Sequence, residues 1–578
     1  MKKILSSFML LLFLTGNIAA QNIPVKGVVR SATDSEPLIG VSVFVKGTSK
    51  GAATDIDGAF SLSIQPEDVL TFSYLGYKTQ EIPVGNQTTI DVVMQEDNQL
   101  LNEVVVIGYG VQKKSVVTAA ISKVTSDDLE TATPSRIEDV LKGKVSGVQI
   151  TQSSGQPGAD SKVRIRGIGT INNSNPLYIV DGMAVDGGIN YLNPVDIESV
   201  EVLKDAASAA IYGTRGANGV ILITTKQGAK GKATVNYDFS YGWQNPWKKK
   251  AVLNATEYMT LMNERNINHN GDPIYSPSDI ANAKTTDWQD EIFNYDAPIV
   301  SHQVNINGGS EKIQYFLSFG YFNQEGIIGG NYDKSNYERY SVRSNNTYTA
   351  FEDKTRNFLS KLTVGTNIGY SRALSSSIDP NSEYGSLLGS ALGFNPAIPV
   401  YATDPDAVLA EHPYAVKDKN GRVFSLPPAG FQEIANPVGM LNQPNSSILN
   451  EDKFVASAWA EINLYEGLKF RSSFGMDLAF WGNNGYTLPY YLASQGKNVD
   501  KENSSVTSDM HRGYTWQVEN LLSYDKTFGD HTIALIAGQS AMKYTLREQY
   551  GTTFYLLSSD PTKAQLSNSI GEVTTQRA

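Results

Sequence analysis

The stretch Gly467–Phe480 reads GLKFRSSFGMDLAF, and its apolar and polar residues alternate along the chain. One set of alternate positions is mainly apolar and comprises Leu468, Phe470, Phe474, Met476, Leu478 and Phe480. The other set comprises Lys469, Arg471, Ser473, Gly475, Asp477 and Ala479. A period of two predicts a strand with one apolar and one polar face. Such a strand lies either between lipid and a wet lumen or in a soluble sandwich, and alternation alone does not distinguish these two settings.

Eight further segments after residue 230 alternate in the same way, and the connections between them distinguish the two settings. The nine segments lie near residues 232–243, 299–308, 312–324, 336–349, 357–370, 453–465, 467–480, 512–526 and 530–545. The connections contain roughly 55, 3, 11, 7, 82, 1, 31 and 3 residues. Long loops at one end and tight turns at the other are typical of an outer-membrane β-barrel. We therefore expect a partial barrel over residues 229–578, with its first strand running outward from the periplasm.

Composition excludes several classes of function. The 578 residues carry a formal net charge of −11, which argues against nucleic-acid binding. The absence of cysteine removes disulfides and thiol chemistry. The five histidines are widely spread, and we find no phosphate-binding, dinucleotide or nucleophile-elbow motif. We expect no enzyme, no catalytic residue, no metal site and no cofactor.

The N-terminus has the pattern of an export signal. Lys2 and Lys3 precede the apolar run Ile4–Leu14, and small residues follow at Ala19 and Ala20. An apolar run of this length is too short to span a bilayer as a helix. Residues 1–20 are therefore predicted to be a cleaved signal peptide, with a membrane anchor as the alternative.

Two units precede the barrel. Residues 21–97 contain short strands separated by turn residues, which predicts a small β-sandwich. In this unit the turn Thr54–Phe60 has Asp55 and Asp57 at the spacing of a cation loop but lacks the closing glutamate, so a plain hairpin turn is expected. Residues 115–228 mix strands with short helices and are predicted to form a separate α/β unit. In that unit we expect one helix to start at Pro134 and another, Asp205–Gly213, to stop at Gly213.

Several motifs carry a family resemblance. Residues 22–95 resemble the carboxypeptidase regulatory-like domain, a prealbumin-like sandwich without catalytic residues. The runs Asp139–Ile150, Val163–Met183 and Asp196–Lys226 closely resemble the plug domain of TonB-dependent outer-membrane transporters. More narrowly, they resemble the SusC/RagA branch, as does the early barrel segment Tyr315–Ile327.

This resemblance implies a plugged 22-stranded barrel that imports a bulky nutrient across the Gram-negative outer membrane. The implied partners are the TonB protein with its ExbB–ExbD energy supply, a SusD-like surface lipoprotein, outer-membrane lipid, and a glycan or, less often in this branch, a peptide. Nine strands fall short of 22, so we expect the chain to lack the C-terminal half of the barrel. The alternative is an outer-membrane-anchored adhesin or scaffold without energised transport.

The linker, residues 98–114, contains a segment that matches the TonB box of this branch. Its residues are Glu103, Val104, Val105 and Val106, and the sandwich and this segment are expected in the periplasm. An extended β-branched run can add as a strand to a sheet edge of a partner protein. The alternative is that the run completes a sheet of the neighbouring sandwich or plug.

Other residues are assigned expected roles by their position. Arg164 and Arg166 alternate on one strand and are expected to pair with acids of the barrel wall rather than with substrate. Four aromatic residues near strand ends are expected to form an interfacial girdle, with sugar stacking as the alternative; they are Tyr241, Trp243, Phe480 and Trp481. The loops 244–298 and 371–452 are expected to face substrate and lid, but no substrate-binding residue can be named.

Overall fold

The computed structural model divides the chain into two compact units, Met1–Thr118 and Ala119–Ala578. The predicted signal peptide and Glu103 lie outside the described residues. For residues 104–107 and 110–113 the backbone is described without its side chains. The described residues are 23–32, 35–46, 48, 50–74, 77–95, 104–107, 110–113, 121–129, 136–152, 154–185, 188–205, 209–378, 386–428, 434–493, 498–529 and 531–570.

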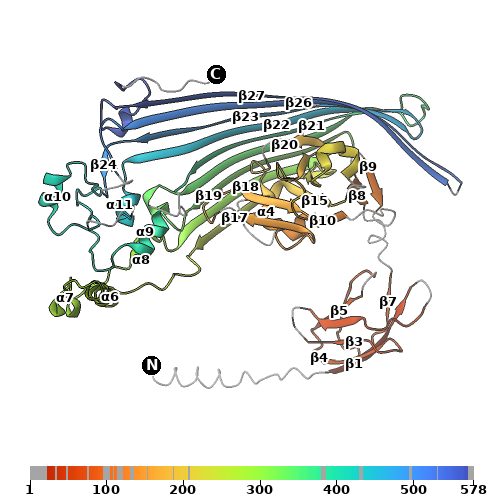
Figure 1. The fold of residues 1–578 in the computed structure, drawn as a ribbon. Helices are drawn as coiled ribbons and strands as arrows, with labels where there is room; N and C mark the ends of the chain where they lie inside the picture. The colour runs from red at the N-terminus through yellow and green to blue at the C-terminus, as the bar shows by residue number, and fades with distance from the viewer. Residues whose placement is uncertain are drawn as a thin grey trace, which may run out of the picture. The chain divides into compact units, whose positions relative to one another are not determined.

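The first unit begins with the predicted sandwich (Figure 1). One sheet has the order β4-β1-β7 and the other β3-β2-β5-β6. Alternate residues of each strand point between the sheets, where Val25, Val43 and Phe72 are buried. The strands are β1 Ile23–Ser31, β2 Ser42–Val45, β3 Gly51–Ala53, β4 Ala59–Ile64, β5 Val69–Ser73, β6 Gln80–Pro83 and β7 Val92–Met94.

The turn between β3 and β4 joins the two sheets, because β3 pairs with β2 and β4 pairs with β1, so the expected hairpin is wrong. The Asp55 carboxylate accepts hydrogen bonds from the backbone N–H groups of Asp57 (3.0 Å) and Ala59 (2.9 Å). Gly58 takes a φ of 71°, a conformation that favours glycine. The carboxylate therefore supports the turn itself.

The second unit begins with the plug, whose five-stranded sheet has the order β10-β15-β16-β13-β14. A separate hairpin of β11 and β12 and the short helix α4 pack with it around one apolar core. The elements are β10 Ile121–Thr125, α3 Ser126–Leu129, α4 Ile137–Leu141, β11 Val148–Gln152, β12 Ser161–Ile165, β13 Leu177–Val180, β14 Met183–Val185, η2 Pro194–Asp196, β15 Ile197–Leu203, η3 Ala210–Gly216 and β16 Val220–Thr225.

Two helix boundaries differ from the predictions. Helix α4 begins at Ile137 after an extended Arg136, so Pro134 does not start it. Residues 206–208 of the helix predicted over Asp205–Gly213 lie outside the described residues, and from Ala210 the chain forms a 3-10 segment, η3, that runs through Gly213 to Gly216. Gly213 breaks the helical path with a φ of 59°, and the chain then resumes a helical turn. Glycine thus kinks this segment rather than ending it.

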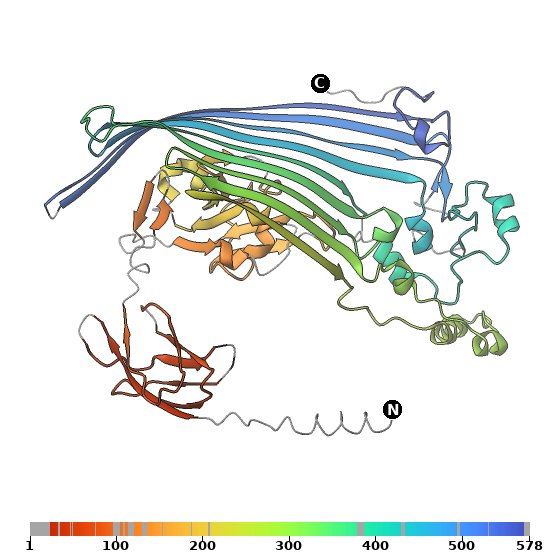
Figure 2. The same ribbon diagram turned by 180° about the vertical axis from the view of Figure 1, so that it is seen from behind.

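The nine predicted barrel strands are all present and form one antiparallel sheet in chain order, from β17 to β27 (Figures 1 and 2). The plug lies against the concave face of this sheet. The strands are β17 Gly231–Gln244, β18 Ala297–Gly309, β19 Ile313–Glu325, β20 Asn336–Glu352, β21 Lys361–Ser376, β22 Asn445–Tyr465, β23 Leu468–Thr487, β26 Ser505–Phe528 and β27 His531–Phe554.

The two faces of β23 carry the alternation that its sequence predicts. Gly475, Asp477 and Ala479 are buried on the inward face, which meets the plug. Phe474 and Phe480 are 46% and 42% exposed on the outward face. The mainly β fold, with a sandwich, a plug and part of a barrel, is therefore confirmed.

Long connections gather at one end of the sheet, which we call the loop end, and tight turns lie at the other, the turn end (Figure 1). Within the described part of the chain, no helix is both long and apolar enough to cross a bilayer. The loop elements are α6 Ala255–Asn268, α7 Pro277–Ala281, α8 Trp288–Ile292, α9 Leu387–Gly393, α10 Pro405–Glu411, α11 Pro437–Leu441, β24 Tyr490–Tyr491 and β25 Asn498–Val499.

Candidate functional site

A buried ion pair joins the barrel wall to the plug. Arg343 on β20 places Nη1 3.4 Å from Oδ2 of Asp181, which lies in the turn after β13. Asp181 also accepts hydrogen bonds from the backbone N–H and the hydroxyl of Thr225, at 2.9 and 2.7 Å. Asn345, two residues along the same face of β20, donates to the Thr225 hydroxyl (2.8 Å) and to the Lys226 carbonyl (2.7 Å). The plug is therefore held by directional polar contacts as well as by shape.

A second polar contact joins η2 to strand β18. The Gln303 side chain donates to Asp196 (2.7 Å) and accepts from Asn193 (2.7 Å), and all three side chains are buried. Burial raises the pKa of Asp196. A Cβ on Gly320 of the wall would lie 2.5 Å from the Asn193 amide nitrogen, so a glycine is needed there for this close approach.

Two buried arginines of the wall, rather than Arg164 and Arg166 of the plug, make polar contacts across this interface, which reverses the prediction. Arg164 donates to Asn175 (2.6 Å) and to the Val163 carbonyl (2.8 Å), both within the plug. No carboxylate of the described barrel strands forms an ion pair with Arg164 or Arg166, so the predicted pairing is wrong. Instead, Arg339 on β20 is fully buried and donates to the Asn190 carbonyl at 2.9 Å. Arg339 and Arg343 share one face of a predicted strand, a signal that the sequence already contained.

A cavity of about 500 Å³ lies between the loop end of the plug and the wall. Arg136 organises its floor, because its guanidinium donates to Asp160 (3.0 Å), Asn190 (3.0 Å) and the Gly158 carbonyl. The plug contributes Arg136, residues 156–160, Asn190 and Tyr191, and the wall contributes Tyr337, Ala373, Ser375, Leu449, Glu451, Lys453, Asp477, Ala479, Trp481, Gly513, Thr515 and Tyr544.

Aromatic rings and charged groups share the lining of this cavity. Lys453 and Asp477 form a buried ion pair at 2.9 Å, and the Lys453 ammonium lies 5.6 Å from the centre of the Tyr191 ring. Tyr337, Trp481 and Tyr544 add three more rings. Rings beside fixed carboxylates and cations can bind a ligand that has both apolar faces and hydrogen-bonding groups.

Trp481 therefore departs from the girdle prediction. It lines the cavity, stacked in parallel with His511 at 5.3 Å between ring centres, so it is not a lipid-facing residue. Tyr241, Trp243 and Phe480 are exposed and lie on the outward face, at 55%, 62% and 42%. The alternative of sugar stacking stays a prediction for Trp481, whose ring lines the cavity.

The long connections fold together into one apolar core at the loop end. Trp288, Phe394, Val438 and Leu492 are buried there, and they come from three connections that are distant in sequence. The Trp288 and Phe394 rings meet edge to face at 4.9 Å between centres. The connections thus form a packed layer with fixed side chains.

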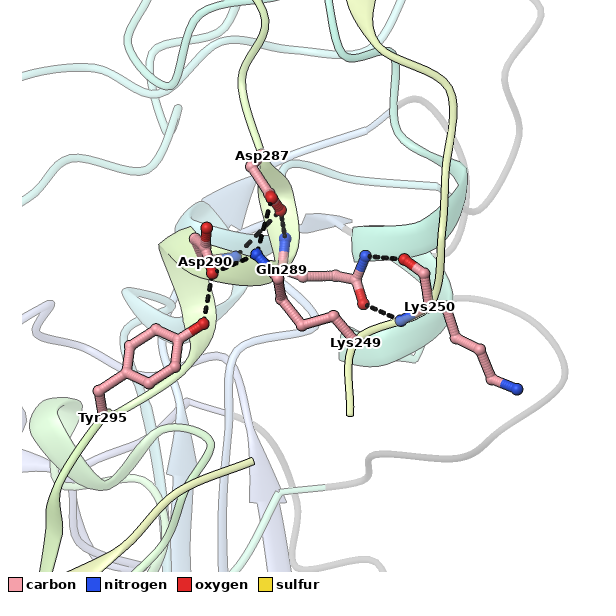
Figure 3. A network of polar contacts seen from close by, with 6 residues as sticks. All are labelled: Lys249, Lys250, Asp287, Gln289, Asp290 and Tyr295. Atoms are coloured by element: carbon pink, nitrogen blue, oxygen red, sulfur yellow. Dashed lines mark hydrogen bonds and ion pairs between the residues drawn. The ribbon is translucent and has the colours of Figure 1, made fainter. Parts of the chain in front are cut away.

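A polar network joins Lys249 and Lys250, near the start of the connection between β17 and β18, to helix α8 near its end (Figure 3). The Lys249 ammonium bridges Asp290 (2.7 Å) and Asp287 (3.0 Å), and Tyr295 donates to Asp290. These hydrogen bonds raise the pKa of Lys249 and lower the pKa of Asp290. The side-chain amide of Gln289 pairs with the backbone N–H and carbonyl of Lys250 at 2.9 and 2.8 Å.

The predicted TonB box coincides with a strand of its own. Strand β8, Val104–Ile107, pairs with β9, Gly110–Lys113, in a two-stranded antiparallel hairpin. Among the described residues, neither the sandwich nor the plug pairs with it. Because Ile107 and Gly110 close a two-residue turn, they form a hydrogen-bonded pair, and so does Val105 with Gln112. The N–H groups of Val104 and Val106 therefore point to the open edge of the hairpin.

The comparison with known proteins follows the same division of the chain. The CarboxypepD_reg-like domain model matches residues 25–106, and the TonB-dependent Receptor Plug Domain model matches residues 113–220. Over 556 residues the chain is 34% identical to TonB-dependent receptor SusC of Bacteroides thetaiotaomicron, covering 93% of this chain and 52% of SusC. The chain is therefore similar to TonB-dependent receptors over its sandwich, its plug and its barrel strands. TonB-dependent receptor P3 of Formosa agariphila is also 34% identical, with 93% of this chain and 49% of that protein covered.

A solved structure shares the fold of this chain. The RagAB peptide importer in its open-open state superposes with a TM-score of 0.67 at 23% identity, covering 82% of this chain and 53% of that chain. The chain spans about half the length of the curated relatives that it matches. These relatives are TonB-dependent receptors and not enzymes, in agreement with the expectation that the chain is not an enzyme.

Proposed function

We propose that this receptor imports a bulky nutrient across the outer membrane, driven by TonB, together with a SusD-like surface lipoprotein. The observation that carries the proposal is a plug held in the barrel by polar contacts, with a ligand-sized cavity above it. In this proposal the loop end faces the outside, and the turn end, the TonB box and the sandwich face the periplasm. The packed loop layer is the surface on which the lipoprotein lid would dock.

We favour a glycan over a peptide as the cargo. Four aromatic rings and several fixed charged groups line one cavity, and flat rings with adjacent carboxylates suit the apolar faces and hydroxyls of sugars. The RagAB structure is described as a peptide importer, so a peptide is the competing cargo for this fold.

The coupling step uses strand β8. A strand of TonB would add to the open edge of the hairpin, where the Val104 and Val106 N–H groups point outward. A proline at Val106 removes one of these donors, whereas a proline at Val105 removes a donor that faces β9. The two variants therefore separate addition to the open edge from displacement of β9.

The test is cross-linking to TonB in cells that carry the intact receptor. Because the chain has no cysteine, Val104→Cys would carry its sole thiol and can form a disulfide with single-cysteine TonB variants. We expect Val106→Pro to abolish both this disulfide and growth on the cognate glycan, and Val105→Pro to retain both. Normal growth of both proline variants would refute strand addition and leave the adhesin or scaffold alternative.

A further inference from the structure

The outward face of the sheet contains two arginines in direct opposition. Arg512 on β26 and Arg547 on β27 are register partners, and both are exposed. The inward face is identified independently, since Thr515 is buried and Met542 contacts Arg215 of the plug. Alternation then places residues 512 and 547 on the opposite face. Directly opposed like charges on one sheet face are destabilising unless an anion lies between them.

No described carboxylate neutralises this pair. The acids nearest in sequence, Asp509 and Glu548, lie on the inward face, where His511 bridges them at 3.1 Å on each side. Asp452, which lies outward two strands away, accepts a hydrogen bond from the Tyr370 hydroxyl at 2.5 Å. Strand alternation thus places Asp509 and Glu548 on the opposite face from the arginine pair, and Asp452 is hydrogen-bonded to Tyr370.

The arginine pair lies where the apolar surface of the barrel ends. Register places it in one outward row of neighbours, which comprises Tyr340, Arg372, Asp452, Phe480, Arg512 and Arg547. The next outward row toward the turn end is mainly apolar and aromatic and comprises Val342, Tyr370, Phe454, Leu478, Tyr514 and Thr545. Toward the loop end the next outward row mixes the polar residues Glu338, Asn450 and Gln549 with the apolar residues Leu374 and Met510. The charges of the row that contains Arg512 and Arg547, next to a mainly apolar row, therefore place it near the level of lipid headgroups.

We propose that Arg512 and Arg547 bind the phosphate of a phosphorylated glycolipid in the outer leaflet. A guanidinium forms paired hydrogen bonds with phosphate oxygens, and two of them facing each other can hold one phosphate between them. The apolar row below would contact the acyl chains. This proposal rests on one part of the proposed function, namely that the loop end faces the outside of the cell.

The test is native mass spectrometry of the intact receptor with added lipid. We expect the wild type to retain phosphorylated lipid A and to lose dephosphorylated lipid A. Phosphatidylglycerol and inorganic phosphate are tested in the same way. Arg512→Gln with Arg547→Gln should reduce retention at least tenfold, and Arg547→Gln alone should reduce it severalfold. Arg372→Gln is the matched control, because Arg372 shares the row and the face but lies opposite Asp452.

Equal lipid retention by the double variant would overturn the proposal. Binding of inorganic phosphate alone, or a preference for phosphatidylglycerol, would also overturn it. A dimer of the wild-type receptor that is absent from the double variant would overturn it too, because it would identify a second copy as the occupant. Heat-modifiable migration on gels establishes that each variant keeps its barrel. Because the measurement involves no uptake, it stays informative if energised import is refuted.

Discussion

Arg343 of the barrel wall lies 3.4 Å from Asp181 of the plug, with the two side chains only 7% and 6% exposed. Removing two charges from water costs several kcal/mol, and Thr225 offsets part of this cost because it donates two hydrogen bonds to Asp181 and accepts one from Arg343. Moving the plug away from the wall would break the ion pair and its hydrogen bonds together. The pair therefore opposes displacement of the plug.

Replacing one partner should loosen the plug. We expect Arg343→Met to destabilise plug docking by about 3–5 kcal/mol, because it leaves the Asp181 carboxylate buried without its cation. The measurement is hydrogen exchange of peptides covering β13 and β16 in the intact receptor, together with the entry of a large antibiotic into cells. Arg164→Met, whose described contacts remain within the plug, is the control. An antibiotic sensitivity equal to that of the wild type would contradict the prediction.

Adjacent residues on β23 offer a matched pair for the cavity. Trp481 faces the cavity and Phe480 faces outward, so Trp481→Ala should weaken glycan binding about tenfold, or roughly 1.4 kcal/mol, while Phe480→Ala should leave it unchanged. Titration of purified receptor with an oligosaccharide panel and a peptide panel measures both effects. If only peptides bind, and Trp481→Ala weakens them, the cargo assignment is wrong while the cavity assignment stands.

The barrel strands could be predicted because their pattern is local. Each strand between lipid and lumen repeats apolar and polar residues with a period of two, and register then fixes every side chain to one face. Trp481 was assigned wrongly because tryptophan suits both a lipid interface and a polar cavity. Its position one residue after the outward Phe480 already indicated the inward face.

Contacts between distant segments could not be predicted in the same way. Arg164 and Arg343 each lie on a strand, two or four residues from a second arginine that the alternation predicts on the same face. Only the fold determines which of them meets a carboxylate. The loop layer depends on Trp288 and Phe394, which meet across two long connections without regular periodicity. Similarly, the residue type at Gly213 predicts the end of a helix, but the 3-10 segment continues to Gly216.

The loop layer should depend on its apolar core more than on its ion pairs. Trp288→Ala should destabilise the layer by about 3–5 kcal/mol, because it removes a buried ring and its hydrogen bond to the Asn395 carbonyl. Lys249→Met should cost less than about 1 kcal/mol, because its ion pairs are exposed to solvent. Limited proteolysis of the intact receptor measures both. Equal protease sensitivity of the two variants would contradict this ranking.

The buried Glu138 of helix α4 makes the plug sensitive to pH. Burial raises the pKa of Glu138, and its Oε2 atom has no hydrogen-bond partner in the described structure. At a pH below the ordinary glutamate value of about 4.3, both the folded and the unfolded states are protonated, so this group has no effect on stability. As the pH rises above that value, the unfolded state ionises first, and the plug loses stability until the raised pKa is passed.

Glu138→Gln should therefore slow the exchange of α4 amides at pH 8, and the gain should disappear near pH 4. The measurement is hydrogen exchange of the intact receptor, corrected for the intrinsic rate at each pH. Glu198→Gln, at an exposed position of the same plug, is the control and should change nothing at either pH. A gain for Glu138→Gln that is the same at pH 4 and pH 8 would show that the amide acts through packing, because a packing effect does not depend on the ionisation of the replaced carboxyl group.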